Sequence, residues 1–477
     1  MKAALSIGQL LLTVLLLFTA CQKAEPTLPL PNSRNTGTQA NTIDSTGMET
    51  WLRQVCAYDH RRAGSANWEA AMQDVEAILR EMGYTEIEKN YFDIQYWEST
   101  NWSLEVQLGE EWISMPSFFE QGSGLTGPEG LEAELVYVGR QIESEEEVAG
   151  KIVVADLEFG TTGATGLPNP VVRPNHLSFP EESILSSGDV YWQAKEAGAL
   201  GVLFIMAEFH GNVKEYMYIA HDDILRALPA QFVGNRDGIK LRCFAQEGRR
   251  ARIVQEGIYE TRQVYNLWTT LEGSSQQNLI ISTHLDSPFR GVIEDGSGIV
   301  SVLAQAQAWY DTPLAERKKE LYFVFTATHL YKDSPGGAIF SDTYPDIMAR
   351  SDALIEIEHI GAIQQAVEND DFVNTSALSP IGIYHSEDEG YVTAELMNMI
   401  ANYPPVGGPI NTIETDFPLT EAASWIVTNP DLPYISLITN PTYLLTIDDD
   451  FDKIDMGAVV QTNRNLLRLI TNYAENL

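Results

Sequence analysis

The stretch Leu279-Ile-Ile-Ser-Thr-His284-Leu-Asp286-Ser-Pro288 decides how the rest of this sequence is interpreted. Its apolar, β-branched start is typical of a buried strand, and the strand ends in an imidazole and a carboxylate one residue apart. The loop Glu294-Asp295-Gly296-Ser297-Gly298 then brings two more carboxylates. Because His, Asp and Glu side chains are the usual nitrogen and oxygen ligands of zinc, these two segments predict half of a metal site at the end of a strand.

Four apolar runs of strand length follow one another along the chain, at residues 278–283, 320–327, 353–358 and 433–439. Such runs are typical of parallel strands buried on both faces, and the helical spacing in residues 297–310 and 457–475 predicts helices that cover them. Ligands of open parallel sheets bind beyond the carboxyl ends of the strands. Since the first three runs lead to His284, His329 and Glu358, one edge of the sheet is predicted to collect metal-binding side chains.

The N-terminal residues have the pattern of a secretory signal. Lys2 precedes an apolar stretch at residues 7–20, which is too short to predict a membrane span. The segment Phe18-Thr19-Ala20-Cys21 resembles the lipobox of bacterial lipoproteins, in which the cysteine is lipidated. Residues 1–21 are therefore predicted to be a lipoprotein signal peptide, with Cys21 anchoring the protein to a membrane of the bacterial cell envelope, facing the periplasm or the exterior. A plain secretory signal with a chance cysteine is the alternative.

Composition excludes several classes of protein. Residues 22–45 are polar and contain three prolines, so they are expected to form a flexible tether. The net charge of −37 and the lack of a basic cluster argue against nucleic acid and direct adhesion to anionic lipid as partners. Cys56 and Cys243 are too few for a disulfide scaffold or a cysteine-rich metal site. We expect two unrelated buried thiols, with a single bridge between them as the alternative.

The order of motifs resembles that of the co-catalytic zinc exopeptidases of the M28 type, which include bacterial leucyl aminopeptidase and glutamate carboxypeptidase. The matching segments occur in the family's order and include Arg62-Ala-Gly-Ser65, His284-Leu-Asp286, Asp295-Gly-Ser-Gly298 and Glu358-His-Ile-Gly361. The resemblance implies an α/β fold with a mixed, largely parallel sheet flanked by helices, of the phosphorylase/hydrolase-like kind. It also implies zinc as the cofactor and a peptide or protein as the ligand.

Part of the chain resembles a protease-associated domain, a small β-rich module. The segments that carry this resemblance lie at residues 132–139, 148–156 and 191–205. Together the two resemblances divide the chain into a first part of an exopeptidase-like domain at residues 46–125, a protease-associated-like insert at 126–260 and a second exopeptidase-like part at 261–477.

The family resemblance transfers the ligands of one zinc ion to His284, Glu294 and Glu358. All three residues are nitrogen or oxygen donors, although the family has Asp at both carboxylate positions. Asp286 is expected to lie behind the imidazole of His284 and to orient it.

The ligands of the family's second zinc ion are not matched. The family's Glu-Glu pair, whose first member is the general base, corresponds to Thr328 and His329, or to His329 and Leu330 if the register shifts by one. Its late histidine corresponds to Leu445. A leucine cannot bind zinc, and a threonine is a degenerate general base. His329 is a doubtful metal ligand or a substitute base, whereas His359 is expected to pack beneath the edge of the sheet.

Two interpretations of function follow from this sequence. The favoured one is a pseudoenzyme, a peptidase-fold lipoprotein with an eroded dizinc site that binds a peptide or protein and has weak or no peptidase activity. The alternative is an altered metallo-exopeptidase with a single zinc ion. One zinc ion or none is predicted, and whether the protein is an enzyme stays open between these hypotheses.

Overall fold

A computed structural model of the chain describes residues 43–161, 168–169, 190–217, 225–329, 331, 333–386, 391–402 and 410–476. The predicted signal peptide with Cys21, and residues 22–42 of the predicted tether, lie outside the described residues. The described part begins just before helix α3 (Ser45–Val55), which Asp44 caps with its side chain. Within the described ranges, no helix is long and apolar enough to cross a membrane.

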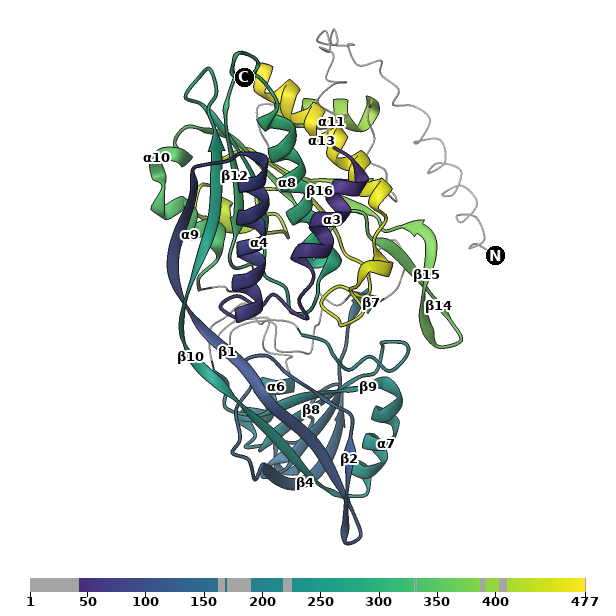
Figure 1. Cartoon of the computed structure of the whole chain (residues 1–477). Coiled ribbons are helices and arrows are strands. Elements are labelled where there is room, and N and C mark those ends of the chain that lie inside the picture. Colours follow the sequence, from purple (N-terminus) through teal and green to yellow (C-terminus); the bar gives the residue numbers. More distant parts are fainter. Residues whose placement is uncertain are drawn as a thin grey trace, which may run out of the picture. The chain divides into compact units, whose positions relative to one another are not determined.

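A mixed sheet forms the centre of the described chain (Figure 1). Its middle consists of four parallel strands in the order β12, β11, β13 and β18, which span Glu320–Thr326, Asn278–His284, Ser351–Ile357 and Tyr434–Thr439. These strands confirm the four predicted apolar runs, and nearly all of their residues are buried. Beyond β18 lie β16 (Ile381–His385), which is antiparallel to it, and β17 (Ile410–Glu414).

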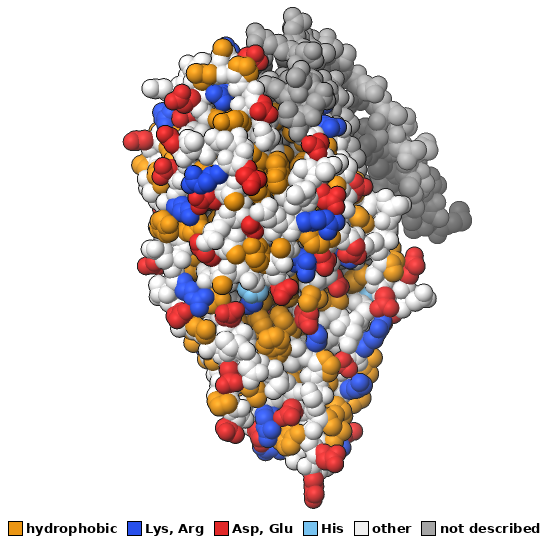
Figure 2. All heavy atoms as spheres, in the orientation of Figure 1, with side chains coloured by type: hydrophobic (Ala, Val, Ile, Leu, Met, Phe, Trp, Pro, Cys, Tyr) orange, Lys and Arg blue, Asp and Glu red, His pale blue; other side chains and the backbone are white. Residues whose placement is uncertain are grey.

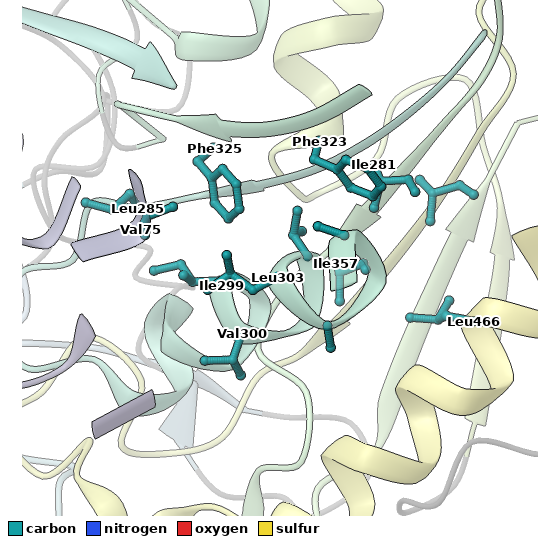
Figure 3. Close-up of a cluster of buried hydrophobic side chains, with 14 of the residues drawn as sticks. Val75, Ile281, Leu285, Ile299, Val300, Leu303, Phe323, Phe325, Ile357 and Leu466 are labelled. Atoms are coloured by element: carbon teal, nitrogen blue, oxygen red, sulfur yellow. The ribbon is translucent and has the colours of Figure 1, made fainter. Parts of the chain in front are cut away.

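Helices cover both faces of the parallel strands. One face packs against α3 and against α4, α8 and α13, which span Ala66–Met82, Ser297–Tyr310 and Met456–Asn476. The other face packs against α9, α10 and α12, which span Gly336–Thr343, Pro345–Met348 and Ala422–Thr428. Because successive residues of a strand point to opposite faces, Ile281 belongs to the first of these clusters and Ile280 to the second. Figure 3 shows Ile281 and Phe323 beside Leu303 of α8.

Two long strands lead from this sheet into the region predicted to be an insert. Strands β1 (Ile87–Leu108) and β10 (Arg250–Leu271) pair antiparallel along most of their length (Figure 1). The first residues of β10, from Arg250 to Ile253, pair antiparallel with β4. From β4 a series of parallel strands continues in the order β4, β5, β8 and β9, which span Leu131–Gly139, Ile152–Asp156, Gly201–Met206 and Ala230–Gly234. Helix α6 (Val190–Glu196) packs on one face and α7 (Asn235–Gln246) on the other. The resemblance of this region to a protease-associated domain, and the domain boundaries, stay predictions.

The remaining elements are short or peripheral. Strand β2 (Glu111–Met115) pairs with β1, and β3 (Phe118–Phe119) pairs with β9. Strands β14 (Ile363–Glu368) and β15 (Asp371–Leu378) form a separate hairpin, and α11 (Tyr391–Asn402) packs beside α13.

The region at residues 126–260 contacts the segment that follows β18. Tyr216 forms an isolated antiparallel bridge with Thr446, and the backbone N–H of Met217 donates to the carbonyl oxygen of Leu445 at 3.1 Å. The Leu445 side chain is 3% exposed and belongs to an apolar cluster that also contains Tyr216 and Phe209. Leu445 is therefore part of a packed apolar contact.

Charged side chains of both signs are interspersed on the face shown in Figure 2, where basic side chains lie among acidic ones. This distribution agrees with the sequence, in which acidic residues outnumber basic ones without a basic cluster. The two cysteines of the described part are free, which confirms two unrelated thiols. Cys56 is buried as expected, but Cys243 is exposed, so the expectation that both are buried was wrong.

Arg61 fixes the loop that follows β11. The side chain is fully buried, its Nε donates to the carbonyl oxygen of Leu285 at 3.0 Å, and its Nη2 donates to those of Gly291 at 3.1 Å and Glu294 at 3.0 Å. Its backbone also pairs with that of Ser287. A buried cation is tolerated when its hydrogen bonds are satisfied. Arg61 therefore holds the backbone that carries the predicted metal ligands.

We predict that Arg61→Met strongly destabilises the protein, because the substitution leaves several buried carbonyl groups without a donor. The expected loss in free energy of unfolding is about 3–5 kcal/mol, measured by equilibrium urea denaturation. Arg53→Met is the control, because Arg53 is an exposed helix residue paired with Glu49 and should change stability by less than about 0.5 kcal/mol. A loss below about 1 kcal/mol for Arg61→Met would contradict this role.

Candidate metal centre

The parallel strands bring three chain segments to one edge of the sheet. Strand β11 ends at His284, which is in register with Thr326 at the end of β12. Strand β13 ends immediately before Glu358. Because these strands are parallel neighbours, the residues that follow them emerge at the same edge, as the sequence predicted.

The turn at Val292–Gly296 carries two adjacent carboxylates with different environments. The carboxylate of Asp449 accepts hydrogen bonds from the backbone N–H groups of Ile293 and Glu294, both at 2.9 Å, and so fixes the turn. Asp295 Oδ1 accepts from the backbone N–H of His359 at 3.0 Å, and its Oδ2 accepts from the Thr283 hydroxyl. Asp295 is therefore engaged in holding the backbone, whereas the Glu294 side chain extends among the histidines.

Two buried histidines flank the Glu294 carboxylate. His284 Nε2 lies 3.9 Å from Glu294 Oε1, and His359 Nε2 lies 3.0 Å from Glu294 Oε2. His284, His359 and Asp295 also each offer one potential ligand atom, and these three atoms lie within 4.8 Å of one another. The backbone of His359 has a positive φ of 50°. His359 is thus buried at the sheet edge, as expected, and its imidazole beside Glu294 also offers a potential ligand atom.

Asp286 supports His284 from behind. The Nδ1 atom of His284 lies 3.1 Å from the backbone oxygen of Asp286 and 3.4 Å from its Oδ1. The same carboxylate oxygen accepts from the backbone N–H of His329 at 2.8 Å. With a proton on Nδ1, the Nε2 atom of His284 keeps its lone pair and can bind a metal ion.

A second group of ionisable residues adjoins the first. Glu358 Oε1 accepts from the backbone N–H of Glu421 at 2.6 Å, and Glu421 Oε2 lies 2.9 Å from His329 Nδ1. The ring of His329 stacks on that of His284, with a centroid distance of 4.5 Å. Glu356 is also buried on β13, where it accepts from the Ser282 hydroxyl.

The pKa shifts show how these charges are balanced without a metal ion. Burial alone would raise the pKa of Glu294, but His359 and the other histidines outweigh it and lower that pKa to about 2. Burial likewise opposes protonation of His359, but Glu294 raises its pKa to about 9. Burial and the neighbouring His329 keep the pKa of His284 well below its usual value. A proton on His359 therefore balances Glu294, while His284 stays neutral.

Burial raises the pKa of two neighbouring carboxyl groups, Glu356 on β13 and Glu358 directly after it. Burial, followed by the charges of Glu358 and Glu421, raises the pKa of Glu356 well above its usual value. The pKa of Glu358 is also raised, first by burial, although His329 and His359 act against this effect. Such crowding of buried carboxyl groups is relieved when a cation binds among them.

All of the predicted metal and catalytic positions from His284 onward lie at this edge of the sheet. Thr328 is buried, but its hydroxyl donates to the carbonyl oxygen of Ser334 at 2.6 Å, so it is engaged with the loop rather than with a reacting group. Of the buried residues near these positions, Glu356 and His359 were not assigned to the site from sequence, and Glu421 was missed altogether. The adjacency of His359 to Glu358 was a usable signal, whereas Glu421 belongs to no recognisable motif.

The residues present fit a zinc ion. Three shielded polar atoms have no hydrogen-bond partner among the described residues, namely His284 Nε2, Glu358 Oε2 and His359 Nδ1, while His359 Nε2 faces Glu294 at 3.0 Å. Buried polar groups are normally hydrogen-bonded, so such a group of unsatisfied nitrogen and oxygen atoms is typical of a metal site. Imidazole and carboxylate are also the donor types that zinc prefers when thiolates are absent.

Comparison of sequences reveals no relatives. No protein-family model matches the chain, and no curated protein matches it either.

Comparison of structures finds zinc peptidases. A peptidase M28 precursor from Shewanella amazonensis SB2B has 17% sequence identity and a TM-score of 0.68, over 92% of this chain and 96% of that one. A zinc aminopeptidase from Bacillus subtilis has 14% identity and a TM-score of 0.64, over 90% and 95% of the two chains. An aminopeptidase from Aneurinibacillus sp. strain AM-1 has 16% identity and a TM-score of 0.58, over 90% and 94%. The chain therefore has the fold of the M28-type zinc aminopeptidases.

Proposed function

We propose that the protein is an altered metallo-exopeptidase that holds a single zinc ion at the edge of the sheet and hydrolyses peptides. The observation that carries this proposal is the group of buried, unsatisfied donor atoms on His284, Glu358 and His359 around the Glu294 carboxylate. The shared fold supports it at a coarser level.

The zinc ligands in this proposal are His284, Glu294 and Glu358, with His359 as an additional donor. His359 supplies a nitrogen that the family resemblance did not include, and it compensates in part for the leucine at position 445. Zinc, when bound, polarises a carbonyl group and lowers the pKa of water. The positive charge of the ion would replace the proton of His359 as the partner of Glu294.

Proton transfer in this proposal is assigned to His329 because no carboxylate occupies the family's general-base position. Glu421 Oε2 orients the ring through Nδ1, and Glu421 is itself fixed by donors that include the Ser424 hydroxyl at 2.9 Å and the backbone N–H of Gly337 at 3.3 Å. A carboxylate that fixes one ring nitrogen leaves the other, Nε2, as the atom that exchanges a proton with the ligand. Burial disfavours the charged ring, but Glu421, Glu358 and Glu294 together raise the pKa of His329, and a dication would offset the last two of these charges.

A metal-free peptide-binding protein is the second candidate, and it is the interpretation that the sequence favoured. The packing of Leu445 in an apolar cluster supports it, because this position contributes no ligand to a second zinc ion. The lipid anchor at Cys21, location in the cell envelope and a peptide or protein partner belong to both candidates and rest on the sequence.

We predict that the purified protein contains about one zinc ion per chain and that His284→Ala abolishes zinc binding. Elemental analysis by mass spectrometry measures both values. Chelation should also lower the thermal midpoint of the wild type, because a ligand that binds the folded state stabilises it.

His210→Ala is the matched control for zinc binding. His210 is a partly exposed histidine that pairs with Asp370 away from the metal centre, so its loss should leave the zinc content unchanged. Metal-free wild-type protein that folds normally and stays metal-free after incubation with zinc would reject the metalloenzyme and favour the binding protein.

We predict that His329→Gln lowers kcat about 100- to 10,000-fold with little change in KM, because it removes a positioned proton-transfer group. Hydrolysis of peptides with free and with blocked amino termini measures the effect and also reveals the end preference. Zinc content should be unchanged in this variant. A zinc-loaded wild type that hydrolyses neither kind of peptide would contradict the catalytic role.

A further inference from the structure

Arg62, the neighbour of Arg61, has a buried guanidinium group whose hydrogen-bonding capacity is unused. The residue is 9% exposed, and its Nε and Nη1 atoms are shielded from solvent without a hydrogen-bond partner. Arg61 on the same loop has the opposite character, since its donors are matched to carbonyl groups. The two adjacent arginines therefore differ in their hydrogen bonding: the donors of Arg61 hold the backbone, whereas donors of Arg62 have no partner.

An unsatisfied arginine is unexpected in this chain. The sequence has 67 acidic residues and 30 basic ones, so carboxylates are abundant, and a partly buried arginine such as Arg242 pairs with Asp156 at 2.7 Å. Burial strongly disfavours an unpaired charge, and burial is the main cause that lowers the pKa of Arg62. Buried polar groups without partners are rare in folded proteins and often belong to functional sites.

Tyr96 is a second buried polar side chain beside Arg62. It is 1% exposed, and burial, followed by the charge of Glu98 and its hydrogen bond to the hydroxyl, raises the pKa of Tyr96. The charge of Glu98 also acts on Arg62, but no ion pair within 4.0 Å joins these two side chains. Nε and Nη1 of Arg62 are therefore buried without a paired carboxylate among the described residues.

Aromatic side chains connect this position to the segment that follows the metal ligands of β11. The guanidinium carbon of Arg62 lies 5.8 Å from the ring centroid of Phe119, and Phe119 stacks on Phe118 at 4.3 Å. Phe118 in turn lies 5.6 Å from Phe289, which comes three residues after Asp286.

The segment after β12 also adjoins Arg62. Tyr331, two residues after His329, is buried and acts electrostatically on the guanidinium. Arg62 also directly follows Arg61, whose backbone pairs with that of Ser287 in the segment that leaves β11. A ligand that extends away from the metal along this segment would therefore approach Arg62.

We propose that Arg62 binds a carboxylate of the peptide ligand while the rest of the peptide extends toward the metal centre. The proposal rests on the proposed function for the orientation of the ligand, and it names the class of ligand as peptides with a carboxylate at this position. A guanidinium matches a carboxylate with two parallel hydrogen bonds, and the neighbouring Phe119 accommodates apolar atoms. The carboxylate belongs either to the C-terminus or to an acidic side chain.

Calorimetric titration with matched peptide probes tests the proposal. Ala-Ala with a free C-terminus is compared with amidated Ala-Ala, and amidated Ala-Glu is compared with amidated Ala-Gln. We expect at least one charged probe to bind about 10- to 100-fold more tightly than its neutral counterpart, in line with hydrogen bonds to charged groups. The pair that shows the preference identifies the source of the carboxylate.

Substitutions distinguish this role of Arg62 from general effects of mutation on ligand binding. Arg62→Gln should reduce the preference to about that of the neutral probes, Arg62→Lys should retain part of it, and Glu98→Gln should bind the charged probe at least as tightly as the wild type. Equal binding of charged and neutral probes by the wild type, or an unchanged preference in Arg62→Gln, would overturn the proposal. All titrations are repeated on chelated protein. A preference for the carboxylate probe that persists in a protein without zinc would reject the metal site but support this inference.

Stability gives an independent readout. Arg62→Met should keep or raise the urea midpoint of unfolding, because a methionine of similar length removes an unpaired buried charge. This direction is opposite to that expected for Arg61→Met. A drop in midpoint for Arg62→Met as large as that for Arg61→Met would assign Arg62 a structural role and overturn its assignment as a ligand-binding residue.

Discussion

The buried guanidinium of Arg61 is the interaction on which the metal centre depends. It satisfies the carbonyl groups of Leu285, Gly291 and Glu294, so one side chain fixes both ends of the loop between β11 and α8. Asp449 completes this support by accepting from the backbone N–H groups of the same turn. Without these bonds the backbone polar groups of a buried loop would be unsatisfied, and Glu294 would not be held beside the histidines.

The loop places Glu294 in a crowded electrostatic environment. Buried histidines and carboxyl groups from three strand ends lie within a few ångströms of one another, and in the absence of a metal ion the charge is balanced by a proton on His359. A dication would serve the same purpose with more of the donor atoms satisfied. His359 on the neighbouring segment adds an imidazole nitrogen to these donors.

The main features of the fold could be predicted because they depend on local pattern. The four apolar runs became β18 and the strands that carry the site, and the predicted helix at residues 297–310 matches α8 residue for residue. Burial on both faces leaves a continuous apolar signature that needs no knowledge of partners. The same pattern predicted that His284, Glu358 and His329 lie at one edge of the sheet, because the carboxyl ends of neighbouring parallel strands lie side by side.

The sequence by itself thus determined the α/β architecture and the segments that form the site, since both follow from periodicity and from motif order. Only the tertiary structure decided which side chains meet. His359 joins the site through a backbone turn with positive φ, and Glu421 reaches His329 across 92 residues of chain. Arg61 and Arg62 are adjacent residues of the same type. The guanidinium of Arg61 donates to carbonyl groups, whereas two nitrogen atoms of the Arg62 guanidinium have no hydrogen-bond partner. The physical reason is that hydrogen bonding and burial depend on distances between segments far apart in the chain, which no local pattern encodes.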